Sequence, residues 1–322
     1  MRLVTFRTGS GPARAGALAE NDTRVVDLQH AHRARFKATS PQLDSVLAVI
    51  EGGANALDLA TETVRNAPED AVVARPTVTL DAPVPAPPQM RDFLCFEKHL
   101  LQSFAAVRRL RAGQTGEPEP QGAVQVPQVW YERPVFYHPN RLNVVGTDHD
   151  VVWPDYSRMI DFELEFGCFI GPGGRNIPHE KARDHIFGYT IFNDFSARDE
   201  QTLDMAGQLG PGKGKDFDRA NVMGPCLVTA DEIGDPYRLD MIARVNGTEW
   251  GRGNSREMHW KFEDCIAHIS RGETLHPGEF FGSGTVGNGC GLEHLRFLSP
   301  RDVVELEVEK IGVLRSRVVR RG

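Results

Sequence analysis

The chain has 322 residues, of which 40% are hydrophobic and 25% are charged, a composition typical of a globular protein with a sizeable core. A formal net charge of −7 without a long basic run argues against nucleic acid or an anionic membrane surface as a partner. No segment has the roughly 18 apolar residues of a membrane span, and MRLVTFRTGS lacks the apolar core of a signal peptide. Five widely spaced cysteines indicate reduced thiols, so we expect a cytoplasmic protein.

The first eighty or so residues are expected to form a small α+β domain. MRLVTFRT and TRVVDL have the pattern of short strands, and residues 40–67 have the periodicity of one or two helices. The stretch LDAPVPAPPQM contains four prolines, which exclude a helix or a central strand. We therefore place a domain boundary there, between residues 1–85 and residues 86–322.

The second part is expected to be mostly β-structure with a few helices. RDFLCF predicts a short strand, followed by a helix that ends near Gly113 and by a loop rich in glycine and proline. From Tyr131 onward, alternating segments are separated by Gly, Pro, Asn and Asp, which is typical of strands joined by turns. Two more helices are expected, in HEKARDHIF and in SARDEQTL, where Ser196 and Asp199 have the spacing of a capping box.

The segment IDFELEFGCFI, Ile160 to Ile170, has an unusual arrangement of charge. Its even positions are apolar, whereas the odd face begins with Asp161, Glu163 and Glu165. Side chains two residues apart leave the same face of a strand about 7 Å apart, where like charges repel each other. Either the strand has a solvated acidic face, or this face lines a cleft and its carboxylates need a cation.

Two further residues are candidates for the same site. Asp194 lies where the strand GYTIFNDF passes into a helix, a position that also suits a capping or turn residue. Two glutamates and an aspartate supply only oxygen donors, which suit Mg²⁺, Mn²⁺ or Ca²⁺ better than Zn²⁺. His99 begins the helix after Asp92, so a base follows a carboxylate at a strand–helix junction; taken alone, a surface histidine is the more ordinary explanation.

In this order, RDFLCFEKH, DFELEF, GYTIFNDFSARDEQ, LGPGKGKDFDRANVMGPCLV and LHPGEFFGSGT resemble the fumarylacetoacetate hydrolase family over about residues 86–322. The resemblance implies a mostly β catalytic domain with helices, a β-roll or sandwich, preceded by a small α+β N-terminal domain. It also implies a homodimer. It further implies a divalent ion, Mg²⁺ or Ca²⁺ with Mn²⁺ also possible, held by Asp92, Glu163, Glu165 and Asp194.

Other roles follow from the resemblance, position by position. His99 falls at the catalytic base, Glu293 at the carboxylate that orients this base, and Lys215 at a catalytic lysine. The remaining matches are substrate contacts, namely Arg108, Tyr137, Gln201, Gly284 and Thr285. Met205 and the pair Asp218-Arg219 depart from the family pattern, which bears on the identity of the substrate more than on the chemistry.

The predicted activity is hydrolysis of a carbon–carbon bond in a β-diketo acid of the fumarylacetoacetate or acylpyruvate type, as in the catabolism of aromatic compounds. Water activated by His99 and Glu293 would attack a carbonyl group, and Lys215 would stabilise the oxyanion and the departing enolate. One alternative keeps the metal site for isomerisation, decarboxylation or hydration of a 2-oxo acid. Another is a non-catalytic dimer stabilised by metal, although every predicted ligand and the base are present.

Overall fold

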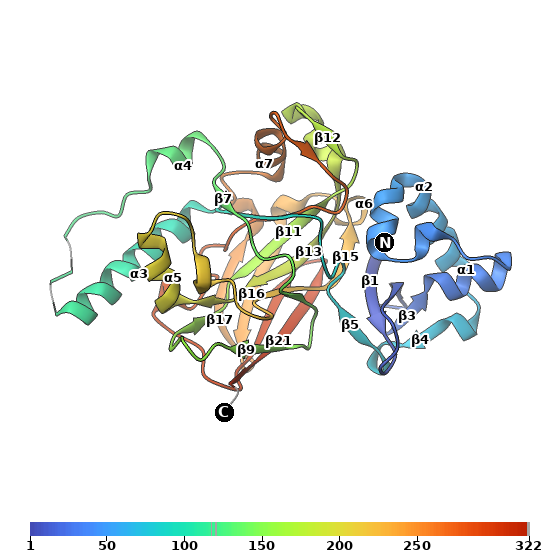
Figure 1. Ribbon diagram of the computed structural model, residues 1–322, viewed down its shortest axis with the longest axis horizontal. Coiled ribbons are helices and arrows are strands. Elements are labelled where there is room, and N and C mark those ends of the chain that lie inside the picture. Colours follow the sequence, from blue (N-terminus) through green and yellow to red (C-terminus); the bar gives the residue numbers. More distant parts are fainter. Residues whose placement is uncertain (117, 120, 321–322) are drawn as a thin grey trace.

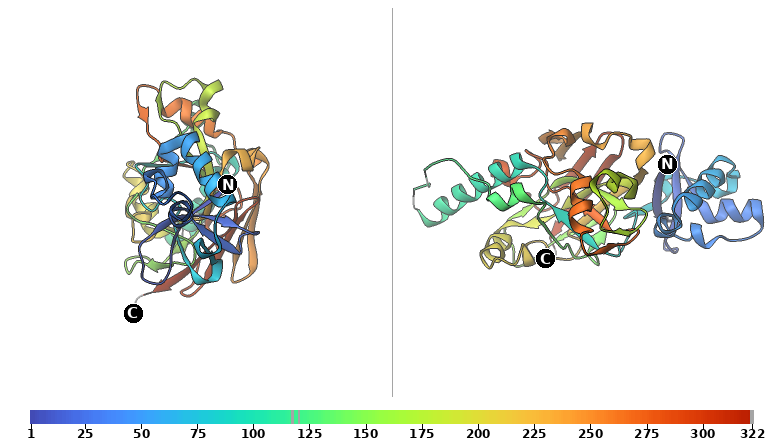
Figure 2. Two further views of the ribbon diagram at one scale, coloured as in Figure 1. Left: turned by 90° about the vertical axis from the view of Figure 1, so that its right-hand side faces the viewer. Right: turned by 90° about the horizontal axis from the view of Figure 1, so that it is seen from above.

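The computed structural model describes residues 1–116, 118–119 and 121–320. Two β-sheets pack against each other in the middle of the molecule, with the N-terminal residues at one end and a long helix, α3 (Glu97–Thr115), at the other (Figures 1 and 2). One large core cluster contains side chains from both sheets. The predicted fold class, mostly β with helices around it, is confirmed. Within the described part of the chain, no helix is long and apolar enough to cross a membrane.

Among the residues described, twelve strands form the larger sheet, ordered β4-β3-β2-β1-β15-β13-β11-β19-β6-β7, with β5 beside β1 and β8 beside β15. These strands are β1 Arg2–Arg7, β2 Arg14–Ala19, β3 Arg24–Asp27, β4 Val72–Ala74, β5 Thr79–Asp81, β6 Met90–Phe93, β7 Phe136–Tyr137, β8 Val144–Val145, β11 Leu164–Ile170, β13 Ile186–Asp194, β15 Asn221–Thr229 and β19 Phe280–Gly282. Its central strands β11 and β13 are buried at every residue. A solvated acidic face on β11 is therefore ruled out.

The smaller sheet has five strands in the described residues, in the order β17-β16-β20-β21-β9. They are β9 Asp150–Trp153, β16 Asp240–Val245, β17 Thr248–Asn254, β20 Val303–Val308 and β21 Gly312–Arg320. Two short pairs complete the β-structure, β10 (Ile160–Asp161) with β14 (Ser196–Ala197) and β12 (Gly174–Arg175) with β18 (Thr274–Leu275). The β10–β14 pair matters for the site because it joins the acidic segment to the SARD segment.

Helices cover the ends and edges of the sheets (Figure 1). Besides α3, the α-helices are α1 Leu28–Phe36, α2 Val46–Arg65, α4 Gln128–Glu132, α5 Arg198–Ala206, α6 Ala230–Ile233 and α7 Phe262–Ile269. The predicted "one or two helices" of residues 40–67 are α2 with a kink at Gly53, whose φ of 59° favours glycine. α3 continues two residues past the predicted end at Gly113.

One local prediction is wrong. Ser196 does not cap α5: it belongs to β14, and Ala197 occupies the N-cap without a side-chain bond. Asp199 instead accepts hydrogen bonds from Ser157 Oγ (2.6 Å) and from the Arg158 backbone N–H (2.7 Å). Pairing of β14 with β10 thus replaces the helix cap. The helix predicted in HEKARDHIF is present as a 3₁₀-helix, His179–His185.

The N-terminal residues extend the larger sheet. β1 pairs with β15, with Leu3 opposite Leu227, and α2 buries Val46, Val49 and Ile50 in the same cluster as side chains of the central strands. Residues spaced by three and four lie on one helix face, which explains why this face of α2 is apolar. The division into residues 1–85 and 86–322 stays a prediction.

Candidate active site

The carboxylates of the candidate site come from neighbouring strands of the larger sheet. Asp92 on β6 lies opposite Gly282 on β19, which in turn lies opposite Gly167 on β11. A Cβ atom at Gly282 would lie 2.3 Å from Asp92 Oδ1 and 3.5 Å from Glu165 Oε2, so this glycine leaves the space that the carboxylates need. Asp194 ends β13, the other neighbour of β11.

Asp92, Glu165 and Asp194 form a buried group, here called the carboxylate cluster. Their ligand atoms lie within 4.8 Å of one another, and each residue is at most 5% exposed. Among the residues described, no donor group reaches Glu165 Oε2 or Asp194 Oδ1. Buried carboxylate oxygens without a partner are costly, and an oxygen-only ligand set suits a hard divalent ion. The residues present therefore fit such an ion.

The electrostatics of the cluster agree with this fit. Burial, followed by the charge of Asp194, raises the pKa of Asp92 to about 8. Burial and the neighbouring Asp92 raise the pKa of Glu165 well above its ordinary value. Burial also raises the pKa of Asp194, although Lys215 acts in the opposite direction. The cluster thus holds more acidic groups than the nearby lysine neutralises, which favours the binding of a cation.

Glu163, the fourth predicted metal ligand, lies beside the cluster and contacts two buried cations. Its Oε1 is 2.8 Å from Arg198 Nη1, and its Oε2 contacts Lys215 Nζ. Burial favours the neutral acid, but Lys215 and then Arg198 outweigh burial and lower the pKa of Glu163 to about 2. Lys215 also contacts Asp194 Oδ2, so this lysine joins Glu163 to the carboxylate cluster.

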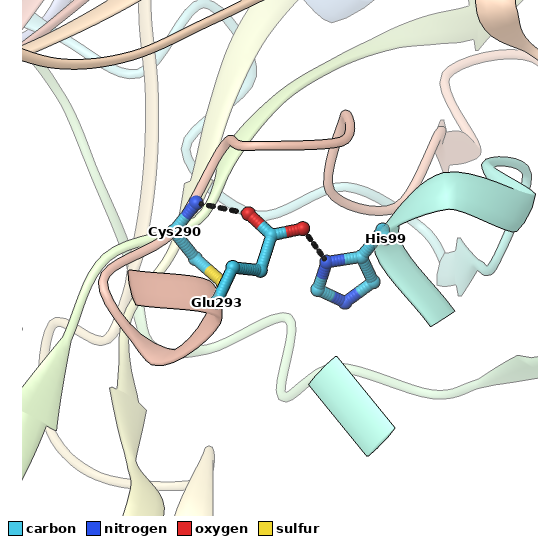
Figure 3. Close-up of side chains that lie close together, drawn as sticks. All are labelled: His99, Cys290 and Glu293. Carbon is cyan, nitrogen blue, oxygen red and sulfur yellow. Dashed lines mark hydrogen bonds and ion pairs between the residues drawn. The ribbon is translucent and has the colours of Figure 1, made fainter. Parts of the chain in front are cut away.

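His99 and Glu293 form the predicted pair of base and orienting carboxylate (Figure 3). His99 Nδ1 lies 3.0 Å from Glu293 Oε1, and the Cys290 backbone N–H donates to Glu293 Oε2 at 3.1 Å. His99 projects from the first turn of α3, whereas Glu293 lies in a short helical turn, residues 292–294, from a distant part of the chain. Because Glu293 accepts at Nδ1, this nitrogen carries the proton and Nε2 is left as the proton acceptor.

A buried ion pair between Arg198 and Asp161, which the sequence did not predict, lies next to the turn that carries Glu293. Arg198 Nε donates to Asp161 Oδ2 at 2.9 Å, and both side chains are at most 4% exposed. The backbone N–H groups of Gly291 and Leu292 also donate to Asp161, each at 2.8 Å. Asp161 therefore fixes the turn that carries Glu293. Its place on the acidic face of the strand was visible in the sequence, but its partner comes from a segment 37 residues away.

A cavity of about 590 Å³ connects these groups. Nine of the predicted site residues line it, namely Asp92, His99, Arg108, Tyr137, Glu163, Glu165, Gln201, Lys215 and Thr285. Asp194, Gly284 and Glu293 are not among its lining residues, but each forms a hydrogen bond with a residue that lines it. The backbone N–H of Gly284 donates to Asp92 Oδ1 at 3.2 Å. A volume of this size is typical of small-molecule sites.

Two of the predicted substrate contacts bind the carboxylates in this structure. The Tyr137 hydroxyl donates to Asp194 Oδ2 at 2.5 Å, and the Thr285 hydroxyl donates to Glu165 Oε1 at 3.3 Å. Gln201 Oε1 accepts from Arg198 Nη1 at 2.8 Å, which turns its carboxamide toward the ion pair. The substrate-binding roles of these residues stay predictions.

Comparison with known proteins identifies the class. Residues 91–319 match the family described as "Fumarylacetoacetate (FAA) hydrolase C-terminal", and the chain belongs to this family. It is 30% identical over 322 residues to the mitochondrial oxaloacetate tautomerase fahd2 of Xenopus laevis, covering 99% of this chain and 90% of that protein. The fold is similar to fumarylacetoacetate hydrolase from Exiguobacterium antarcticum (24% identity, TM-score 0.73) and to maleylpyruvate hydrolase from Sphingobium sp. SYK-6 with manganese(II) and pyruvate (22%, 0.72), each over the full length of both chains.

The raised pKa of Asp92 predicts how stability and metal binding depend on pH. A folded-state pKa of about 8, against an ordinary value of 3.8, contributes stability at low pH that is lost as the pH rises through about 8. Without added metal, we therefore expect the melting temperature to fall as the pH rises from 3.8 to about 8. Because a divalent ion binds the charged carboxylate, the gain in melting temperature on adding Mn²⁺ should grow over the same range of pH.

Thermal unfolding at several pH values, with and without Mn²⁺, measures both trends. The Asp92→Asn variant is the control: it removes this titration, so the metal-free protein should be more stable than the wild type above pH of about 8. An equal gain from Mn²⁺ at every pH in the wild type would contradict the assignment of Asp92 to the metal site.

Proposed function

We propose that the protein is a divalent-metal-dependent enzyme that moves a proton between carbon and oxygen of a 2-oxo acid, a keto–enol tautomerase. The observation that carries this proposal is the His99–Glu293 pair on the wall of the cavity that also contains Asp92, Glu163, Glu165 and Lys215. A proton acceptor and a group of carboxylates thus face one cavity that is large enough for a small molecule.

Asp92, Glu165 and Asp194, with Glu163 beside them, are the residues that would hold the metal. When bound there, a divalent ion would polarise the 2-oxo group and stabilise negative charge on its oxygen. Oxygen ligands alone admit Mg²⁺, Ca²⁺ or Mn²⁺. The homodimer and the cytoplasmic location stay predictions.

His99 is proposed to carry the proton. Its Nε2 accepts a proton from the carbon next to the 2-oxo group, and the electrons of that C–H bond form the enolate. The imidazolium then returns its proton to the oxygen, which gives the enol, or to the carbon in the reverse direction. Glu293 keeps Nδ1–H in place through both steps and stabilises the imidazolium. The reaction needs no other reactant.

Lys215 is proposed to stabilise the enolate oxygen. An ammonium group has three N–H donors, and two of them are directed to Glu163 and Asp194. Burial opposes the charge on Lys215, but Asp194 and Glu163 raise its pKa above the ordinary value. Lys215 therefore stays charged at neutral pH and has one N–H for the substrate.

The similarity to the Xenopus tautomerase over 99% of this chain supports this reaction. Hydrolysis of a 2,4-dioxo acid is the second candidate, because the same His99 Nε2 could accept a proton from water and so activate it for attack on a carbonyl group. The name of the family favours it as well.

An absorbance assay separates the two reactions. Purified protein with Mg²⁺ or Mn²⁺ is mixed with the enol form of oxaloacetate and, separately, with acetylpyruvate and fumarylacetoacetate. We expect the decay of the oxaloacetate enol to exceed that of buffer and of the His99→Gln variant. Loss of the diketone absorbance with no effect on oxaloacetate would instead establish hydrolysis. No effect on any of the three substrates would refute both candidates.

A further inference from the structure

We propose that Gln102 and Asn288 are positioning residues that hold His99 and Glu293 in the geometry needed for proton transfer. Neither Gln102 nor Asn288 lines the cavity, so neither contacts the substrate. Their amide groups instead bind each other and join α3 to residues 286–293, here called the Glu293 loop. This inference rests on the proposed function only through His99, the proton acceptor in both candidate reactions.

The two segments that supply the base and its orienting carboxylate are far apart in the sequence. His99 and Glu293 are separated by 194 residues, and one hydrogen bond of 3.0 Å joins their side chains. A single hydrogen bond leaves rotation about its own axis free, and it weakens as the N–H···O angle departs from linearity. A second attachment further along the helix removes this freedom.

Gln102 and Asn288 supply this second attachment, almost one helical turn beyond His99. Gln102 Nε2 donates to Asn288 Oδ1 at 2.6 Å, and the Asn288 backbone N–H donates to Gln102 Oε1 at 3.0 Å. Because a backbone N–H can only donate, it fixes which end of the Gln102 carboxamide accepts. Among the residues described, these two bonds and the His99–Glu293 bond are the hydrogen bonds that side chains of α3 form with the Glu293 loop.

The amide pair sets the register of α3, which apolar packing alone does not. His99, Gln102 and Ala106 have the three- and four-residue spacing of one helix face. Ala106 is buried in one cluster with Cys290 and Leu292, so this face of α3 packs against the end of the Glu293 loop. Apolar packing is not directional, whereas hydrogen bonds are. The packing therefore holds α3 against the loop, and the amide pair determines its height and rotation.

The Glu293 loop has anchors of its own on the larger sheet. The Leu164 backbone N–H donates to the Gly289 carbonyl at 2.9 Å, and the Val286 backbone N–H donates to the Leu164 carbonyl at 3.1 Å. Asn288 has a left-handed backbone with a φ of 66°, which asparagine adopts more readily than most residues. Its Nδ2 donates to the Arg252 carbonyl at 3.4 Å. The amide pair thus ties the position of α3 to a loop that the sheet holds in place.

Two variants that weaken the amide pair test the proposal. Gln102→Met keeps the length of the side chain and removes both hydrogen bonds, whereas Asn288→Gly removes one of them and suits the left-handed backbone. We expect Gln102→Met to lower kcat for oxaloacetate enol decay about 10- to 100-fold, the cost of misplacing a catalytic group. Asn288→Gly should act in the same direction. KM should stay unchanged, because no contact with the substrate is lost.

Arg109→Met is the matched control on the same helix. The Arg109 side chain is 57% exposed, and its Nε lies 3.5 Å from Glu119 Oε1 rather than at the Glu293 loop. We expect this variant to keep the wild-type kcat. The Gln102→Met change should also have little effect when it is added to Glu293→Gln, because a residue that acts through Glu293 then has nothing to position.

The ring of His99 gives a second readout that does not depend on turnover. In protein with ¹⁵N-labelled histidine, the nitrogen shifts report which ring nitrogen carries the proton, and the His99 signals are those that disappear in His99→Gln. We expect the Nδ1–H form in the wild type and a mixture of both tautomers in Gln102→Met.

A lower melting temperature of Gln102→Met with the wild-type kcat and tautomer would overturn the proposal, since the pair would then be structural only. An equal fall in kcat in the wild-type and Glu293→Gln backgrounds would overturn it as well. If the wild type acts on none of the three substrates, the proposed function fails, and the His99 tautomer in Gln102→Met alone decides whether the amide pair positions the ring.

Discussion

Replacing Glu293 by glutamine is expected to lower kcat by about 10²–10⁴, the range that a positioned general base contributes, while the fold is retained. In the wild type both carboxylate oxygens are engaged, one by His99 Nδ1–H and one by the Cys290 backbone N–H. A glutamine oxygen replaces the acceptor for Cys290, and its NH₂ group then faces Nδ1. His99 is forced into the other tautomer, so Nε2 carries a proton and no longer accepts one.

The measurement is the rate of oxaloacetate enol decay at saturating Mg²⁺, with circular dichroism as a check on folding. Glu97→Gln is a matched control, since Glu97 lies two residues before His99 on α3 and accepts a hydrogen bond from the exposed Tyr131 hydroxyl. We expect the control to keep the wild-type rate. A Glu293→Gln variant with more than about a tenth of the wild-type kcat would show that the tautomer of His99 does not matter for the rate.

The Asp161→Ala variant is expected to lose about 3–5 kcal/mol of unfolding free energy, because it takes one of two carboxylate partners from the buried guanidinium of Arg198, which keeps only Glu163. The backbone N–H groups of Gly291 and Leu292 lose their acceptor in the same variant. Each buried donor without a partner adds to the cost. Replacing the pair by Asp161→Leu with Arg198→Met should recover part of the loss, since no guanidinium is then buried without Asp161 and Glu163 keeps Lys215 as its cationic partner.

Urea unfolding followed by fluorescence measures these differences. Asp150→Ala is the control, because Asp150 and Arg317 form an ion pair at 2.8 Å in which both side chains are more than a third exposed. Such surface pairs contribute about 0–1 kcal/mol. If Asp161→Ala and Asp150→Ala shift the midpoint equally, Asp161 does not fix the turn that carries Glu293.

The acidic strand shows how far the sequence alone reaches. Alternation and like charges left two interpretations of Glu163 and Glu165, a solvated acidic face or a cleft with a cation, and the structure buries both residues. The sequence did not show that Glu163 contacts Lys215 and Arg198, because such contacts depend on how β10 pairs with β14. Local patterns predict an element and its faces, but not the partner that a distant segment brings.

The SARD segment and the end of α3 were harder to predict from the sequence for the same reason. Helix propensity favoured a cap at Ser196, whereas strand pairing with β10 takes this residue instead. Arg111 has the spacing of an ordinary exposed helix residue, and only the cavity shows that it lines the same volume as His99. The identity of the family, by contrast, was predictable, because it rests on short motifs that keep their order along the chain.

Proton exchange at carbon tests the central proposal most directly. A 2-oxo acid is incubated in D₂O with the protein and Mg²⁺, and loss of the signal from the protons next to the oxo group is followed by proton NMR. If His99 moves a proton between carbon and oxygen, the wild type exchanges these protons faster than buffer, and His99→Gln does not. Cleavage of a 2,4-dioxo acid without such exchange, or equal exchange in the variant, would contradict the proposal.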